Sequence, residues 1–240
     1  MRLNKYISVS GAASRRQGEN IIRDGRISVN GEVVTDPAKN VEPEKDIVTF
    51  DGVVLKINEK KRYYILNKPP GVIVSRKDTH GRKTVIDLLG KETDGVFPVG
   101  RLDADTSGVL LLTDDGSLTH RLIHPSFGIE KIYRAEVEGT VDQDDIIKFG
   151  KGMIFYDGPT APAALKIIEL KDNVSIVEIT IHQGRKRQVR RMLKQAGHPV
   201  IKLERVNFGG ITTKNLPRGK YRALSGEEIE KLKKSANIIV

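Results

Sequence analysis

Cysteine and tryptophan are absent from this chain of 240 residues, and aromatic residues make up only 5% of it. Without cysteine the chain has no disulfide, no zinc site built from thiolates and no cysteine nucleophile. The five histidines are scattered along the chain. We therefore expect a protein without a bound metal and without a cofactor.

Long apolar runs are also missing. No stretch approaches the roughly 20 apolar residues that cross a bilayer as a helix, and residues 1–5 lead into no apolar segment of a secretory signal. Charged residues make up 30% of the chain and hydrophobic residues 38%, which is typical of a soluble globular protein. We expect a cytoplasmic protein with no membrane partner.

Basic residues outnumber acidic ones, which gives a formal net charge of +10 and favours a polyanionic partner. The excess is unevenly placed. Residues 1–26 hold six basic and two acidic residues, whereas residues 27–60 hold four basic and seven acidic ones. The N-terminal part therefore has a basic helical start and an acidic remainder.

Two carboxylates in one short turn, Asp103 and Asp105, precede a run of large apolar residues. The run at 109–112, bounded by Gly108 and by the turn at 114–116, predicts a buried strand. A carboxylate at the edge of a buried strand is costly unless a cation or a set of N–H donors holds it. The rest of the chain must supply that partner.

Three interpretations of this turn are open. Either aspartate could simply bond nearby backbone amides, and that is what we expect of Asp105. The spacing also matches a calcium-binding EF-hand loop, but such a loop needs two flanking helices, and residues 97–100 cannot end a helix. In the third interpretation Asp103 is a catalytic nucleophile or base.

A cation-rich segment at 182–194 holds six basic residues and no acidic one. At helical spacing an apolar stripe begins at Val189 and a basic stripe begins at Arg187. Neighbouring like charges destabilise an isolated helix, which favours a bound partner over plain solvation. Arg190 lies at the border of the two stripes, and a buried carboxylate such as Asp103 would be its natural partner.

Periodicity and turn signals predict an α+β fold with a mixed, mostly antiparallel sheet and peripheral helices. Capping boxes at Ser14 and Ser225 mark two helix starts, and Asn30-Gly31 predicts a tight hairpin. The predicted helices lie at 2–9, 15–25, 84–89, 117–123, 142–149, 187–196 and from 226 onward. The predicted strands lie at 27–29, 32–34, 46–50, 53–55, 63–66, 109–113, 132–137, 164–170 and 175–182.

Residues 58–62 are polar and contain no apolar side chain, so we place a domain boundary there. The prediction is a small α+β module at 1–60 and a larger domain at 61–240. A sharp turn is expected at 67–71, directly after the first strand of the larger domain.

Four motifs occur in the larger domain: Asn-Lys-Pro-Pro-Gly at 67–71, Gly-Arg-Leu-Asp-Ala-Asp-Thr-Ser-Gly at 100–108, Lys-Ile-Tyr-Arg-Ala at 131–135 and Gly-Arg-Lys-Arg-Gln-Val-Arg-Arg-Met at 184–192. Together they resemble the motifs of bacterial ribosomal-RNA pseudouridine synthases, in the branch that modifies single stem-loop sites in the small or large subunit. The first 55 residues resemble the S4-type RNA-binding domain that this branch carries.

The resemblance implies an enzyme that breaks the N-glycosidic bond of a uridine in rRNA, turns the base and rejoins it through C5. Asp103 would act on the sugar as nucleophile or base, and Tyr133 would stack on the uracil with its hydroxyl near the proton that leaves C5. Arg190 would pair with Asp103 and keep it ionised. The target uridine would have to leave its stack. We favour 23S rRNA over 16S rRNA, and leave open whether naked RNA or an assembly intermediate is the substrate.

We expect contacts to rRNA from basic residues and from one serine at a helix start. They are Arg2, Lys5, Ser14, Arg15, Arg16, Arg26, Lys68, Arg101, Arg185, Lys186, Arg187 and Arg191. The expected oligomeric state is a monomer. The alternative function is a non-catalytic rRNA-binding or ribosome-assembly factor, which would have no need of a carboxylate in an otherwise cationic cleft.

Overall fold

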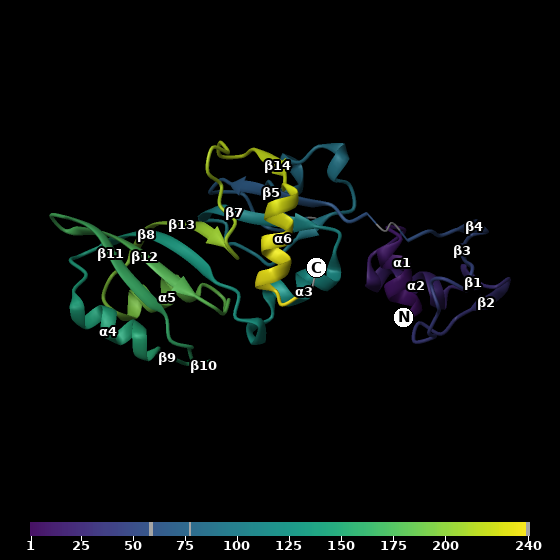
Figure 1. Cartoon of the computed structure of the whole chain (residues 1–240), viewed down its shortest axis with the longest axis horizontal. Helices are drawn as coiled ribbons and strands as arrows, with labels where there is room; N and C mark the ends of the chain where they lie inside the picture. The colour runs from purple at the N-terminus through teal and green to yellow at the C-terminus, as the bar shows by residue number, and fades with distance from the viewer. Residues whose placement is uncertain (58–59, 77, 239–240) are drawn as a thin grey trace. The chain divides into compact units, whose positions relative to one another are not determined.

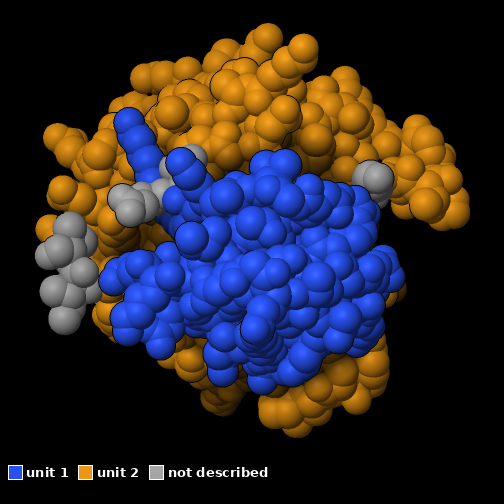
Figure 2. Space-filling view, turned by 90° about the vertical axis from the view of Figure 1, so that its right-hand side faces the viewer, with its two compact units in different colours: residues 1–61 blue, residues 62–240 orange. Residues whose placement is uncertain are grey.

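The structure is a computed structural model that describes residues 1–57, 60–76 and 78–238. Its chain forms two compact units, Met1–Lys61 and Arg62–Val240, which carry different colours in Figure 2. Two residues of the polar segment expected at the boundary, Asn58 and Glu59, lie outside the described residues.

The first unit packs two helices against a small antiparallel sheet with the strand order β2-β1-β3-β4. The capping box begins α2 as predicted, since the Ser14 hydroxyl accepts from the Gln17 N–H and the Gln17 side chain accepts from the Ser14 N–H. Asn30 and Gly31 both have positive φ, which the tight hairpin turn requires. The bounds are α1 Leu3–Val9, α2 Arg15–Arg23, β1 Ile27–Val29, β2 Glu32–Val34, β3 Val48–Phe50 and β4 Val53–Val54.

The second unit is built on one large sheet with the strand order β11-β12-β8-β13-β7-β5-β14, and β6 also pairs with β7 (Figure 1). Among the described strands, β13 and β7 run parallel and the other neighbours in this sheet run antiparallel. The mixed, mostly antiparallel sheet is therefore confirmed. Its strands are β5 Tyr63–Lys68, β6 Phe97–Pro98, β7 Thr106–Thr113, β8 Lys131–Glu138, β11 Ala164–Lys171, β12 Val174–Ile181, β13 Val200–Phe208 and β14 Tyr221–Ala223.

Helices cover both faces of this sheet. The helices α4 and α5 pack into one hydrophobic core, and α3 and α6 pack into a second one. Figure 1 shows α4 beside β11 and β12, and α6 beside β5 and β7. The remaining elements are α3 Gly116–Ile123, α4 Gln143–Lys151, α5 Gln188–Gln195, α6 Gly226–Ser235, the short strands β9 Ile154–Phe155 and β10 Gly158–Pro159, and the 3₁₀ turns η1 Ile86–Leu88, η2 Lys91–Thr93 and η3 Pro125–Phe127.

Strand β7 lies between the two cores, which explains its unbroken apolar sequence. Leu110 and Leu112 belong to the core under α4 and α5, whereas Val109 and Leu111 belong to the core under α3 and α6. Successive side chains of a strand point to opposite faces, so a strand covered on both sides is apolar throughout. The loop that carries Asp103 enters the sheet at the start of this strand.

Two expectations about the second unit were wrong, and one central strand was not predicted. The helix expected at 84–89 is only the 3₁₀ turn η1, and Asn67 and Lys68 continue β5 instead of starting the turn. Strand β13 was not predicted, although it lies in the middle of the sheet. Its alternation is hidden in the sequence because Arg205, a buried residue of this strand, is charged.

No helix of the described part of the chain is long and apolar enough to cross a membrane. The described residues also contain no group of three or more His, Cys, Asp or Glu side chains able to hold a metal ion.

Candidate active site

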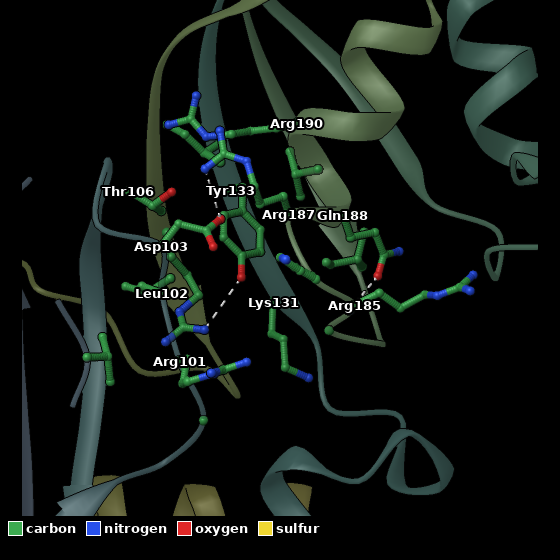
Figure 3. Close-up of a pocket in the computed structure, with 18 of the residues that line it drawn as sticks. Arg101, Leu102, Asp103, Thr106, Lys131, Tyr133, Arg185, Arg187, Gln188 and Arg190 are labelled. Carbon is green, nitrogen blue, oxygen red and sulfur yellow. Dashed lines mark hydrogen bonds and ion pairs between the residues drawn. The ribbon is translucent and has the colours of Figure 1, made fainter. Parts of the chain in front are cut away.

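A pocket of about 560 Å³ opens in the second unit, next to the parallel pair of strands β7 and β13. Its walls come from the loop before β7, from β8 and β13, and from the segment that leads into α5. Figure 3 shows that these elements bring together Asp103, Tyr133, Arg187 and Arg190, which lie up to 87 residues apart in the sequence.

A buried lysine, Lys68, fixes the loop that carries Asp103 through hydrogen bonds to backbone oxygens. The Lys68 ammonium is fully buried and donates to the backbone oxygens of Pro69, Ala104 and Thr106, at 3.0, 3.2 and 2.8 Å. Burial lowers the pKa of Lys68 to about 8, against the opposing charges of Asp105 and Asp103. The expected contact of Lys68 with RNA is therefore wrong, and this side chain positions the loop instead.

Gly108 allows β13 to pass close to β7. A Cβ atom at this position would lie 2.2 Å from the backbone oxygen of Arg205, and the backbone has φ +102°, a conformation that favours glycine. The close approach brings Arg205 to the wall of the pocket.

The two aspartates of the loop have different partners from those expected. Arg187 donates from Nη1 and Nη2 to the two carboxylate oxygens of Asp105, at 3.2 and 3.1 Å. Arg190 donates to the backbone oxygen of Asp105 at 3.0 Å, and its Nη2 lies 3.3 Å from a carboxylate oxygen of the same residue. Asp105 thus accepts hydrogen bonds from two arginines and is not a simple turn residue. The expected bidentate pair between Arg190 and Asp103 is absent from the described residues.

Burial alone would raise the pKa of Asp105. The hydrogen bonds from Arg187 and the charges of Arg190 and Arg187 outweigh this effect and hold the pKa of Asp105 below its ordinary value. The Arg190 side chain is only 11% exposed, and burial lowers its pKa from that of a free guanidinium. Both arginines therefore depend on Asp105 for charge compensation.

The Asp103 carboxylate has fewer close partners than the Asp105 carboxylate. Its side chain is 34% exposed, and the cation within 4 Å of its carboxylate among the described residues is Arg187, at 3.9 Å from Nη1. Figure 3 shows the Asp103 carboxylate beside the ring of Tyr133 and facing Arg187. The carboxylate thus lies at the pocket with a nearby positive charge, and its oxygens are available to a ligand.

Arg187 adopts an unusual backbone conformation for a residue with a side chain. It directly precedes α5 and has φ 50° and ψ 34°. A left-handed conformation of this kind costs of order 1 kcal/mol or more in a non-glycine residue and persists only where surrounding contacts enforce it. Its fork on Asp105 is such a contact.

Tyr133 is buried in β8, and its hydroxyl accepts from Arg205 Nη1 at 3.5 Å. Arg205 and Lys131 also line the pocket, and both are buried. Arg205 was not among the predicted site residues. Charge alone does not single it out in the sequence, because Lys202 and Glu204 of the same strand are charged as well.

Two basic residues expected to contact RNA instead hold the hairpin of β9 and β10. Arg185 donates to the backbone oxygens of Asp157, Gly158 and Pro159. Arg191 pairs with the Asp157 carboxylate through both terminal nitrogens and stacks on Phe155, 3.9 Å from the ring centroid. Arg101 and Lys186 are exposed at the pocket and stay candidates for RNA contacts.

In the first unit, four of the basic residues predicted to contact RNA have exposed side chains and stay candidates, namely Arg2, Lys5, Arg15 and Arg16. The hydroxyl of Ser14 caps α2. Arg26 is bonded to the Asp51 carboxylate and lies over the Phe50 ring, at 4.7 Å from the centroid. Ser14 and Arg26 are therefore already engaged within the unit.

Family models match both units. The model described as RNA pseudouridylate synthase matches residues 62–195, and the S4 domain model matches residues 1–48. A protein of Aquifex aeolicus named Uncharacterized RNA pseudouridine synthase is 41% identical, over 99% of this chain and 96% of that protein.

Two further relatives carry more specific names. Ribosomal large subunit pseudouridine synthase B of Bacillus subtilis is 40% identical, over 98% of this chain and 97% of its own length. Ribosomal small subunit pseudouridine synthase A of Escherichia coli K12 is 38% identical, over 95% and 98%.

Among solved structures, a crystal structure of pseudouridylate synthase matches with a TM-score of 0.70 and 33% identity, covering 97% of this chain and 99% of that one. The resemblance of the motifs, the matched fold and the nearly complete coverage of relatives agree. The chain belongs to the RNA pseudouridylate synthase family, carries an S4 domain ahead of its catalytic domain, and is an isomerase that acts on uridine in RNA.

Proposed function

We propose that this enzyme converts one uridine of 23S rRNA to pseudouridine and that Asp103 is its catalytic carboxylate. The observation that carries the proposal is that the two aspartates of the loop have different partners. Asp105 receives the paired hydrogen bonds of Arg187, and Asp103 keeps its oxygens exposed to the pocket.

Asp103 acts on the ribose of the target nucleotide. As a nucleophile its oxygen attacks C1′ while the bond to N1 of the base breaks, and as a base it removes the proton on C2′. Both routes need an ionised carboxylate. The Arg187 guanidinium at 3.9 Å stabilises that charge without closing a fork on it.

Tyr133 stacks against the uracil that has been turned out of its helix. The ring belongs to β8 at the pocket wall and lies beside Asp103 (Figure 3). Stacking compensates part of the few kcal/mol that unstacking a base costs. The hydroxyl of Tyr133 lies near C5 of the base and takes part in removing the C5 proton.

The S4 domain supplies affinity for the RNA backbone through Arg2, Lys5, Arg15 and Arg16. Arg15 and Arg16 begin α2, where a positive charge opposes the helix dipole. Their position is therefore unfavourable for the stability of the helix and favourable for binding phosphate, which helix N-terminal amides also attract. In the catalytic domain Arg101 and Lys186 extend the contacts around the pocket. We further propose that the enzyme works as a cytoplasmic monomer.

Pseudouridine mapping of rRNA from cells that lack this protein tests the function. We expect one modification to disappear from 23S rRNA and to return when the wild-type gene is restored, but not when the Asp103→Asn gene is. Loss of a 16S site would keep the enzyme class and move the target to the small subunit, as the name of the Escherichia coli relative suggests. An unchanged map would favour the non-catalytic assembly factor.

A further inference from the structure

Arg205 is a buried cation with an unused donor. The residue is 2% exposed, and its Nε donates to the Val109 backbone oxygen at 2.8 Å. Nη1 reaches the Tyr133 hydroxyl at 3.5 Å, and the buried Nη2 has no hydrogen-bond partner among the described residues. A buried N–H group without an acceptor costs free energy, more so when it is charged. A ligand in the pocket would remove this cost.

Lys131 is a second buried cation at the same place. Its ammonium donates to the Ile129 backbone oxygen at 2.9 Å and lies 5.3 Å from the Phe208 ring centroid, while the Arg205 guanidinium lies 4.8 Å from that ring. Burial, followed by the charge of Arg205, lowers the pKa of Lys131 to about 8. Neither cation has an ion-pair partner within the described residues.

Two buried cations without an anion repel one another and lose hydration, so the site is poised for negative charge. Both side chains line the same pocket as Asp103 and Tyr133. No ion pair joins either cation to Asp103 or Asp105 among the described residues, because Asp105 pairs with Arg187 and Arg190, and the cation within 4 Å of Asp103 is Arg187. The missing anion must come from the substrate.

We propose that Arg205 and Lys131 bind a carbonyl oxygen of the target uracil and hold the negative charge of the base while it is detached from the sugar. This inference rests on the proposed function, because it assigns the base-binding part of the same pocket. Tyr133 stacks on the base, and Arg205 at its hydroxyl end meets the base edge that carries the carbonyl.

The charge follows from the reaction. When the bond between N1 and C1′ breaks, its electron pair stays with the base, which becomes an anion with charge shared among N1, O2 and O4. The base turns and C5 bonds to C1′. If Asp103 acted as the nucleophile, its ester bond to C1′ breaks in this step, and if it acted as the base, it returns the proton to C2′. The C5 proton then leaves and N1 gains one, so no oxidant or further reactant is needed.

Sulfur substitution of the uracil carbonyls tests this interaction. Single-turnover rate constants would be measured for wild type and Arg205→Gln on an rRNA fragment with uridine, 2-thiouridine or 4-thiouridine at the mapped position. Removing one donor to a developing oxyanion costs about 100-fold in rate, and we expect that loss for Arg205→Gln on uridine. At one carbonyl, sulfur should slow the wild type about tenfold and leave the variant nearly unchanged, because the variant already lacks the hydrogen bond that sulfur weakens.

Two controls separate this role from a structural one. Arg205→Lys keeps the charge and should recover part of the rate and of the sulfur effect. Arg134→Gln removes an exposed arginine of the same strand as Tyr133, paired with Glu178, and should behave as wild type. If Arg205→Gln does not fold, Lys131→Met tests the same site with Arg205 left in place. This variant should also reduce the sulfur effect.

The inference is overturned if both sulfur substitutions slow wild type and the variants by equal factors, or if wild type is indifferent to both. In both of these cases the proposed function still holds, provided that the wild type converts unsubstituted uridine. If wild type converts no uridine in the fragment or in rRNA, the proposed function itself fails, and the base-binding role fails with it.

Discussion

Arg187 holds Asp105 through a fork of two hydrogen bonds, at 3.2 and 3.1 Å, although Asp103 lies only two residues away in the same loop. The nearer oxygen of Asp103 is 3.9 Å from the same guanidinium. One carboxylate therefore compensates the arginines, and the other remains open to the pocket. This arrangement changes what a substitution at each aspartate should do.

Asp103→Asn should lower turnover at least 1,000-fold while RNA affinity stays nearly unchanged, because the charge is required in the reaction and not for docking. Asp105→Asn should cost about tenfold to 100-fold, since Arg187 and Arg190 lose their partner and Arg187 can then close on Asp103. A tritium-release assay measures both. Asp172→Asn, in an exposed turn with positive φ, is the matched control and should be fully active. Near-normal turnover by the Asp103 variant contradicts its role.

Tyr133→Phe should keep the fold and the RNA affinity, because the ring remains, and should lose most turnover, because the hydroxyl is gone. Arg205 Nη1 would also lose its partner at 3.5 Å. Single-turnover rates with the RNA saturated by enzyme measure the loss of turnover separately from any loss of RNA affinity. If phenylalanine and tyrosine give equal rates, the ring is only a stacking platform.

Arg190→Lys should reduce kcat more than Arg191→Lys. Arg190 donates to the backbone oxygen of Asp105 at 3.0 Å and to that of Val200 at 3.5 Å, and one ammonium cannot reproduce these directions. Loss of one charged hydrogen bond of about 1.5 to 3 kcal/mol corresponds to roughly tenfold to 100-fold. Arg191 holds Asp157 in the hairpin of β9 and β10, so its lysine variant should mainly affect thermal stability.

The same pair of variants gives a test against pH. The pKa of Asp105 is held below its ordinary value, so its ion pairs are intact above the ordinary carboxyl pKa of about 3.9 and are lost as the pH falls further. Weaker pairing in Arg190→Lys should move the acidic limb of kcat/KM to higher pH. Profiles for both lysine variants that superimpose on wild type would count against this coupling.

Lys68→Met should destabilise the protein by several kcal/mol, since three backbone oxygens of the catalytic loop lose their donor. The pKa of Lys68 is lowered to about 8, so burying its charge costs stability below that pH, and the cost falls as the pH rises toward the ordinary lysine value of about 10.4. The lowered pKa of Lys131 should likewise make the stability rise over this pH range. Thermal midpoints between about pH 7 and 10 should therefore increase less in Lys68→Met than in wild type.

Replacing Arg15 and Arg16 by glutamine should weaken RNA binding and slightly stabilise α2, because both charges oppose the helix dipole. The slope of log affinity against log salt should become shallower by about 0.7 to 0.9 for each phosphate that the protein no longer neutralises. Lys45→Gln removes an exposed lysine of the same domain, paired with Glu42, and is the control. An unchanged slope in the double variant would mean that neither arginine touches phosphate.

Local patterns in the sequence were enough to predict much of the fold. The capping boxes at Ser14 and Ser225, the hairpin at Asn30-Gly31 and the apolar strand after Asp103 all form as predicted, because each depends on residues close together in the chain. The family motifs likewise occur in short segments, so the enzyme class was readable before the structure was known.

The partners within the site were decided only by the tertiary structure. Arg187 and Asp105 are 82 residues apart, Arg205 and Tyr133 are 72 apart, and the antiparallel pairing of β13 with β8 places Arg205 opposite Tyr133. A helical wheel gives the direction of Arg190 but not which of two neighbouring carboxylates it meets. Nor does sequence show that Lys68 is buried, because burial of a charge depends on acceptors that distant segments provide.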